Sequence, residues 1–391
     1  MNKVKAKKTG LYSSRELLLN SIESLISSDR IFVGNQPDDF GIGGVISSGN
    51  KVLMLGLGFG GSIRPLISTI EDVQITAIDS DLNILNACSA IMNSYFPLLK
   101  NIKYIHGDAT NFENYTLEKF DLICIDIYTE KGYPDFIFND NFWSKVSESL
   151  TKDGKVIVNS WGLPYHLNPL FGNSPQKGIA NMLIKNYKSV YSLPYRRNIT
   201  FICSNSLIEA KRINSMYELN VIDKLHLDLF LYRFTHSEKI NFSSENEDVS
   251  ILKNRDDIDN EMGIRWPSLI SNINKHLEGN DLEKIDNKSL KELVYDEDRA
   301  TKVIISQLKN NDIEASFFPI SIGALAFSES NKIDWFSRWL AENSKLLYEI
   351  NPQWLINHAL WQVLSIAANP FCDFNNIEEE IKQIIKDIKL F

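Results

Sequence analysis

Five short apolar runs recur between residues 51 and 160, and each ends in a glycine or a polar residue. They are KVLMLGLG (51–58), VQITAID (73–79), IKYIHGD (102–108), FDLICID (120–126) and GKVIVNS (154–160). Segments of helical length separate them. None of the runs alternates strictly between apolar and polar residues, which is typical of strands buried on both faces. The rhythm predicts βαβ units and a parallel sheet covered by helices.

The chain before this core has a different pattern. Residues 11–33 carry apolar side chains at helical spacing, which predicts a helix. We therefore expect residues 1–48 to form an N-terminal helical arm or lid. The Gly-rich stretch 40–50 is expected to be a loop or a short hairpin that leads into the main domain.

The core domain is predicted to extend over 49–236. Within it, residues 187–206 are expected to form two antiparallel strands joined by a turn at Pro194. The polar, acid-rich stretch 237–262 predicts a linker, and the helical spacing of apolar residues beyond it predicts an all-helical domain over 263–391. The predicted fold class is α/β: a doubly wound, Rossmann-like, mostly parallel sheet with an N-terminal helical arm and a C-terminal all-helical domain.

Charge and cysteine usage exclude several classes of function. The chain has 41 Lys+Arg against 50 Asp+Glu, which argues against a nucleic-acid partner bound by bulk electrostatics. It has no apolar run long enough to span a membrane. Its four cysteines form no Cys/His cluster, so no metal is expected. Cys88, Cys124 and Cys203 lie in apolar runs and are expected to be buried, which suits a reducing, cytoplasmic location.

A glycine-rich turn follows the first apolar run. Gly56, Gly58 and Gly60 allow a sharp turn and a close approach of a ligand to the backbone. The helix expected behind them offers free N–H groups at its N-terminus. The glycines repeat at every second residue, unlike the GxGxxG of nicotinamide enzymes. A tight strand–helix connection without a ligand is the alternative.

Acidic residues end the next three apolar runs: Asp79, Asp108 and Asp126. In a doubly wound sheet, an acid at the second strand end can accept hydrogen bonds from both ribose hydroxyls. An acid at the next strand end can accept from an adenine amino group. Each acid alone is as readily a helix cap or a turn residue. Together they mark one edge of the sheet, where ligands bind, and they predict a nucleoside site there.

The order of these features resembles the class I S-adenosylmethionine-dependent transferases, and more narrowly their spermidine-synthase-like branch. The resemblance covers roughly 51–206 and is carried by VLMLGLGFGGSIR, ITAID, YIHGDA, FDLICIDIYTEKGYP, FNDNFWSKVSESLTKDGKVIVNS and NITFICSNS. Met54 stands where methyltransferases generally carry an acid and spermidine synthases carry a hydrophobic residue.

The resemblance implies a donor site for S-adenosylmethionine or decarboxylated S-adenosylmethionine. The three glycines of the turn would contact the sulfonium ligand through their backbone, and Asp79 would hold the ribose. Asp108 and Ala109 would face the adenine.

The chain departs from spermidine synthases at two positions. Phe59 stands in the glycine turn where the family has an Asp that helps to hold the aminopropyl amine. The family's paired-acid motif, Asp-Ser-Ser-Asp-Pro, corresponds to residues 126–130. Its first acid is retained as Asp126 and its second is replaced by Thr129, although Glu130 is adjacent.

Asp126 is the predicted general base, because transfer to an amine or a hydroxyl requires removal of a proton. Tyr128, also predicted to be catalytic, and Tyr133 follow it in a loop that can reach over the site. Trp161 and Tyr165 would form an acceptor site beside His166, an alternative base, although a packed loop with a satisfied histidine remains open.

Three arginines have open roles. Arg64 is expected to meet either a ligand carboxylate or a surface acid. Arg197 and its neighbour Arg196 would matter if the acceptor were anionic, and they are otherwise solvated side chains.

The leading hypothesis from the sequence is S-adenosylmethionine-dependent methyl transfer to a small-molecule acceptor. Transfer of an aminopropyl or 3-amino-3-carboxypropyl group is the close alternative. A catalytically silent protein that binds a nucleoside or a partner is a third. The C-terminal half carries no assignable motif, and three roles stay open for it: covering the site, recognising the acceptor, or pairing with a second chain in a homodimer.

Overall fold

The computed structural model describes the core of the chain, from residue 36 to residue 265 with gaps. The described residues are 36–58, 60–95, 101–163, 167–195, 197–208, 231, 234, 237–240, 250–265 and 349. Most of the expected N-terminal arm and nearly all of the expected C-terminal helical domain lie outside them, so these two expectations stay predictions.

An eight-stranded sheet runs through the described part, in the order β3-β2-β1-β4-β5-β7-β6-β8. The strands are β1 (Lys51–Leu55), β2 (Gln74–Asp79), β3 (Ile102–His106), β4 (Phe120–Ile125), β5 (Leu150–Trp161), β6 (Ser189–Tyr195), β7 (Asn198–Ser204) and β8 (Glu238–Lys239). The five strands from β3 to β5 in this order are parallel, and β7, β6 and β8 continue the sheet antiparallel. The predicted Rossmann-like α/β sheet, with an antiparallel pair after β5, is confirmed.

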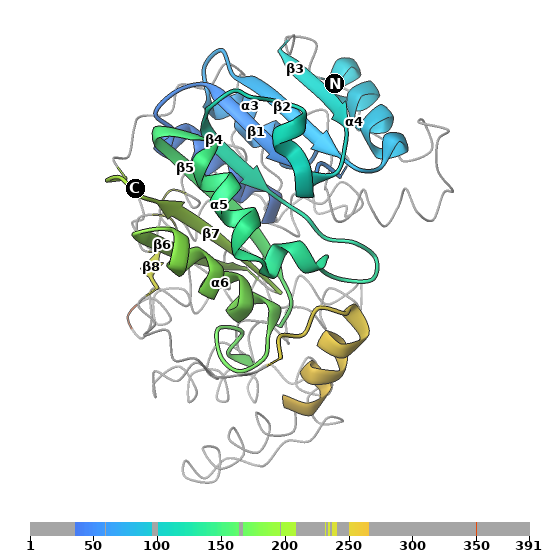
Figure 1. Ribbon diagram of the computed structural model, residues 1–391, viewed down its shortest axis with the longest axis vertical. Coiled ribbons are helices and arrows are strands. Elements are labelled where there is room, and N and C mark those ends of the chain that lie inside the picture. The colour runs from blue at the N-terminus through green and yellow to red at the C-terminus, as the bar shows by residue number, and fades with distance from the viewer. Residues whose placement is uncertain are drawn as a thin grey trace.

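Helices lie on both faces of the sheet. They are η2 (Gln36–Ile42), α2 (Gly43–Ile46), α3 (Ile63–Thr69), α4 (Leu82–Tyr95), η3 (Ala109–Asn114), η4 (Asp135–Phe138), α5 (Asp140–Glu148) and α6 (Pro175–Asn186), with a further helix over 255–265. Figure 1 shows α5 and α6 over the near face of the sheet. Because side chains alternate between the two faces of a strand, Leu53, Ile123 and Val156 pack in one core with Trp143 and Leu183 of those helices.

The first part of the Gly-rich stretch before β1 is helical, so the expectation of a loop or hairpin over 40–50 was wrong for residues 40–46, whereas residues 47–50 form a non-helical connection to β1. The residues of the helical part form η2 and α2 and are almost entirely buried. A Cβ added at Gly43 would lie 2.5 Å from a methyl carbon of Leu122, and one at Gly44 would lie 2.3 Å from the carbonyl oxygen of Thr69. The glycines therefore serve close packing of a helical turn against α3 and the sheet, and not a flexible connection.

The turn between the last two long strands is not at Pro194, which corrects the sequence expectation. Pro194 lies within β6 and pairs with Ile199, and the chain reverses between Tyr195 and Asn198. On its other side, β6 meets β8 only at Tyr191 and Ser192. Pro194 is thus at a strand end beyond this short ladder, where the missing N–H costs nothing.

The cysteine prediction is confirmed, since Cys88, Cys124 and Cys203 are buried free thiols. Burial raises the pKa of all three, that of Cys88 to about 12. Among the helices of the described residues, none combines the length and apolarity that a membrane crossing would require.

Candidate functional site

The glycine turn after β1 is wedged between the ends of two neighbouring strands. The Gly56 N–H donates to the Ile78 carbonyl at 3.0 Å. Gly56 has a φ of +82°, and a Cβ on it would lie 2.1 Å from the carbonyl oxygen of Asp126. Only glycine allows this approach, which brings the turn against the end of β4. Gly58 is exposed with a φ of +50°, whereas Gly60 is buried against Cys88 and Met92 of α4.

Asp79, at the end of β2, holds this turn in place. Its Oδ2 accepts from the Leu57 N–H at 2.9 Å and its Oδ1 accepts from the Asp81 N–H at 2.9 Å. Burial raises the pKa of Asp79 above its usual value, although the backbone donors pull it down. Each carboxylate oxygen retains a further lone pair, so the residue can still accept from a ligand hydroxyl. The geometry fits the ribose-binding role that the resemblance implies.

Asp108 follows β3 and caps η3. Its Oδ1 accepts from the N–H of Thr110 at 2.8 Å and from the Thr110 hydroxyl at 2.7 Å. The side chain is exposed, and Ala109 beside it is half-buried. Asp108 therefore has the capping role that the sequence left open, and its proposed position facing an adenine stays a prediction.

Asp126, directly after β4, is held from two directions. The Asn159 amide of β5 donates to its Oδ1 at 2.9 Å, and the Ser62 hydroxyl donates to its Oδ2 at 3.4 Å. Ser62 immediately precedes α3, behind the glycine turn. Half-buried and oriented in this way, the carboxylate lies between the glycine turn and β5, where it can accept a proton.

Sequence reasoning did not single out Asn159. It could have been identified as a polar residue near the end of the apolar run GKVIVNS, on the strand that neighbours β4.

Three aromatic residues gather next to Asp126. The ring centroid of Tyr128 is 4.9 Å from that of Trp161 and 5.4 Å from that of Tyr133. The Tyr133 hydroxyl donates to the Trp161 carbonyl at 2.7 Å and accepts from the Trp161 N–H at 2.5 Å. Burial raises the pKa of Tyr133, which keeps its hydroxyl protonated for this pair. The loop after β4 is thereby tied to the end of β5.

Two guanidinium groups lie over the Trp161 ring. That of Arg197 is 4.1 Å from the ring centroid and that of Arg255 is 5.7 Å from it. Arg197 also donates to Asp259 at 2.6 Å and to the Gly162 carbonyl at 2.7 Å. Arg255 escaped the sequence analysis because it lies within the stretch interpreted as a linker.

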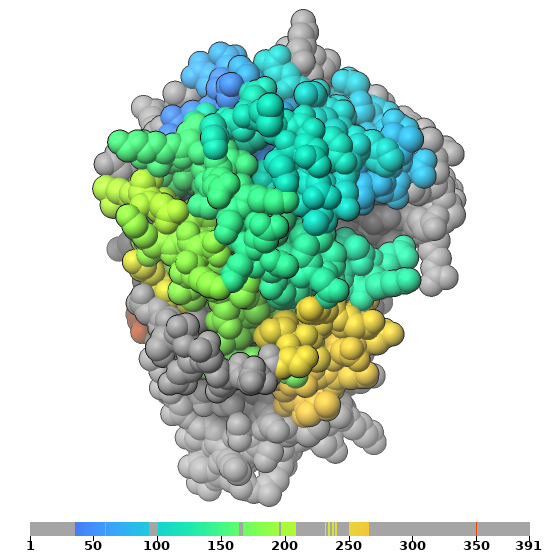
Figure 2. Space-filling view, viewed as in Figure 1, coloured from blue at the N-terminus to red at the C-terminus, as the bar shows by residue number. Residues whose placement is uncertain are grey.

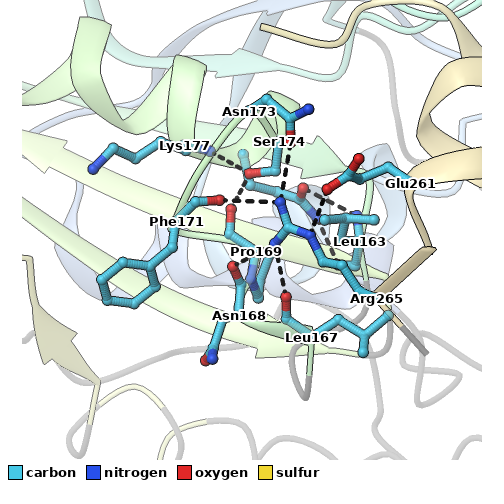
Figure 3. A network of polar contacts seen from close by, with 11 residues as sticks. Leu163, Leu167, Asn168, Pro169, Phe171, Asn173, Ser174, Lys177, Glu261 and Arg265 are labelled. Atoms are coloured by element: carbon cyan, nitrogen blue, oxygen red, sulfur yellow. Dashed lines mark hydrogen bonds and ion pairs between the residues drawn. The ribbon is translucent and has the colours of Figure 1, made fainter. Parts of the chain in front are cut away.

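The segment 250–265 holds the loop between β5 and α6. Figure 3 shows the Arg265 guanidinium at the centre of a network that also includes Glu261. Its acceptors in the loop are the carbonyls of Leu167 at 3.0 Å, Asn168 at 3.3 Å and Phe171 at 3.4 Å, and Oδ1 of Asn173 at 3.0 Å. The Leu252 N–H adds a bond to the Asn173 carbonyl at 2.8 Å.

The same segment holds the loop after β4. The Tyr133 N–H donates to the Lys253 carbonyl at 2.9 Å, and the Arg255 N–H donates to the Lys131 carbonyl at 3.0 Å. In Figure 2 the ochre atoms of 250–265 adjoin the blue-green loop after β4. Segment 250–265 therefore joins the two loops that follow β4 and β5.

Several predicted residues fall elsewhere. Phe59, Tyr165, His166 and Arg196 lie outside the described residues, so the proposed alternative base stays a prediction. Arg64 is completely buried and pairs with the equally buried Asp38 at 3.9 Å, so the surface ion pair considered for it was wrong. Within the residues that the structure describes, no cluster of three or more His, Cys, Asp or Glu side chains is arranged to hold a metal.

Comparison with known proteins shows which proteins the core resembles. Residues 42–204 match the family described as spermine/spermidine synthase domain. A polyamine aminopropyltransferase from Clostridium beijerinckii is 30% identical over 126 residues, which are 30% of this chain and 42% of the relative. One from Buchnera aphidicola is 25% identical over 211 residues, covering 51% of this chain and 67% of the relative.

The chain thus spans about two fifths of the length of the first of these relatives. Among solved structures, a probable spermidine synthase from Corynebacterium glutamicum aligns with a TM-score of 0.35 and 15% identity, over 44% of this chain and 64% of that one. Residues 42–204 thus have the spermidine-synthase-like fold that the resemblance predicted.

Proposed function

We propose that this protein transfers an aminopropyl group from decarboxylated S-adenosylmethionine to an amine of a small molecule. The observation that carries the proposal is the Asp126 carboxylate, oriented by Asn159 and Ser62 at the point where the glycine turn meets the end of β4. The relatives named polyamine aminopropyltransferase support this transfer, which the sequence analysis placed second to methyl transfer.

The donor would lie along the glycine turn. Gly58 exposes backbone there, and Asp79 at the end of β2 can accept from ribose hydroxyls. Asp108 and Ala109 would face the adenine at the next strand end. The donor supplies a carbon activated by its sulfonium group, which departs as a neutral thioether. The protein therefore needs no acid at sulfur, and its task toward the donor is to align it with the acceptor.

Asp126 would act on the acceptor. A new C–N bond forms as the C–S bond breaks, and the amine must lose a proton in the process. The carboxylate takes that proton, while its bonds to Asn159 and Ser62 keep it oriented toward the transfer point. Tyr128, two residues further on, would line the acceptor side of the site together with Trp161.

Methyl transfer is the second candidate, because one departure from the aminopropyltransferase pattern is visible in the structure. Thr129 stands where the family has its second acid, and its hydroxyl donates to the Gly132 carbonyl at 2.8 Å. This side chain serves a tight turn and does not supply a carboxylate to a diamine. Methyl transfer would use the same donor edge and the same Asp126.

Calorimetry with the two donors, followed by mass spectrometry of products, tests the proposal. We expect decarboxylated S-adenosylmethionine to bind more tightly than S-adenosylmethionine and to yield an acceptor heavier by an aminopropyl group. The reverse order of affinity, with a product heavier by a methyl group, would establish the second candidate. Donor binding without any product from a broad panel of amines would support a catalytically silent protein instead.

A further inference from the structure

We infer that the acceptor carries an anionic group in addition to its amine, and that Arg255 recognises this group beside Trp161. The inference rests on the proposed transfer to an amine, because it concerns the other end of the same acceptor. It differs from a polyamine acceptor, whose second end is a cation.

Trp161 lies in the direction in which an acceptor would extend from Asp126. Asn159, which donates to Asp126, is two residues before Trp161 on β5, so both side chains start from the same face of the strand. Tyr128, two residues after Asp126, packs against the Trp161 ring. A molecule with its amine at Asp126 would therefore meet this aromatic pair next.

This end of the site carries a guanidinium close to the aromatic pair. The charge of Arg197 is balanced by Asp259, to which it donates at 2.6 Å. Arg255 is exposed, and in the part of the chain that the structure describes it has no ion-pair partner. Its backbone N–H is fixed to the Lys131 carbonyl, which places the side chain over the ring.

The positive charge of Arg255 would repel the second end of a diamine and attract that of an amino acid. The distal ammonium of a diamine would face Arg255 with the same sign of charge, and Thr129, in place of an acid, offers no compensation. A carboxylate at that end would instead accept charge-assisted hydrogen bonds from the guanidinium, which is suited to binding it with two parallel bonds. The site therefore favours an acceptor with an amine at one end and an acidic group at the other.

A matched pair of probes tests this. Putrescine and δ-aminovalerate share an amine on a four-carbon chain and differ in ending with an ammonium or a carboxylate. Binding of each to the full chain saturated with methylthioadenosine is measured by calorimetry. We expect δ-aminovalerate to bind about tenfold more tightly, the size of one charge-assisted hydrogen bond. Arg255→Gln should remove most of this preference, and Arg255→Glu should reverse it.

The control variant is Lys103→Gln, which removes an exposed cation from β3 at the opposite edge of the sheet and should leave the preference unchanged. Tighter binding of putrescine by the unaltered chain, equal binding of the two probes, binding of neither, or an Arg255→Gln variant with the original preference would overturn the inference. Methylthioadenosine binding itself reports on the donor site. Its absence would count against the proposed function, whereas its presence without the preference would refute the acceptor alone.

Discussion

The donor half and the acceptor half of the candidate site are built in different ways. The donor half uses the ends of β1, β2 and β3, which follow one another along the chain, and it depends on backbone turns and carboxylates. The acceptor half joins the ends of β4, β5 and β7 to the segment 250–265, and it depends on aromatic rings and guanidinium groups. In the proposed reaction, donor binding would therefore depend on the general pattern of the fold, and the choice of acceptor would depend on contacts particular to this chain.

The halves also differ in what holds them. Asp79 fixes the glycine turn through hydrogen bonds within two successive βα units. Arg265 fixes the loop after β5 from a position almost a hundred residues further along the chain. Substitutions can therefore damage one half and spare the other, and the following predictions use this separation.

The largest effect is expected from Asp126→Asn, which removes the proton acceptor and keeps the side-chain shape. Turnover should fall by about 10²–10⁴-fold, the usual contribution of a general base. Donor affinity by calorimetry should stay unchanged, because the carboxylate faces the acceptor. The matched control is Asp121→Asn at the opposite end of β4, which should retain turnover. Undiminished turnover in Asp126→Asn would place the base elsewhere.

The next largest effect is expected from Asp79→Ala, which should reduce donor affinity. Loss of a half-buried hydrogen-bond acceptor should weaken donor binding by about 1–3 kcal/mol. Because Asp79 also holds the glycine turn, the unfolding temperature must be followed in the same samples. Asp81→Asn, which retains the cap of α4, should bind the donor normally. If both variants bind alike, Asp79 does not hold the ribose.

The pH dependence of donor binding sharpens the same assignment. The ionised form of Asp79 is the better acceptor for hydroxyls, and burial raises its pKa above the ordinary 3.8. As the pH falls, this form is therefore lost at a higher pH than it would be for an exposed aspartate. Donor affinity should decline on acidification through that raised pKa. The decline should be absent from Asp79→Asn. The pH dependence of donor affinity in this variant corrects for titration of the donor itself.

The smallest effect is expected from Arg265→Gln. The variant loses the guanidinium contacts to the loop after β5, which positions the acceptor side. We expect KM for the acceptor to rise several-fold, on the order of 1 kcal/mol, with kcat and donor affinity nearly unchanged. Arg265→Lys, which keeps the charge and part of the bonding, should recover some of the loss. A matching loss of donor affinity would show that the two halves are coupled.

The sequence was most informative about the donor half. The glycine turn and Asp79 could be identified because parallel strands bring their carboxyl ends to one edge of the sheet, so their order along the chain predicts their proximity. It was least informative about 40–50 and Pro194. Glycine and proline signal a turn in an isolated segment, but here packing against α3 and pairing with β7 decided their structure.

The acid-rich stretch 237–262 illustrates the same limit. Its composition suggests a solvated connection, yet Asp259, in the helix over 255–265, and Lys253, just before that helix, form ion pairs with Arg197 and Asp135, which lie far away in the sequence. In the sequence, charged residues that form ion pairs with distant residues look the same as charged residues that face water.

By itself, the sequence determined the parallel sheet, the glycine turn and the row of acids, because each depends on a local pattern repeated along the chain. Only the tertiary structure decided that Asn159 orients Asp126 and that Arg255 lies over Trp161. These contacts join residues far apart in the chain, and the energy that selects them comes from packing, which no local spacing encodes.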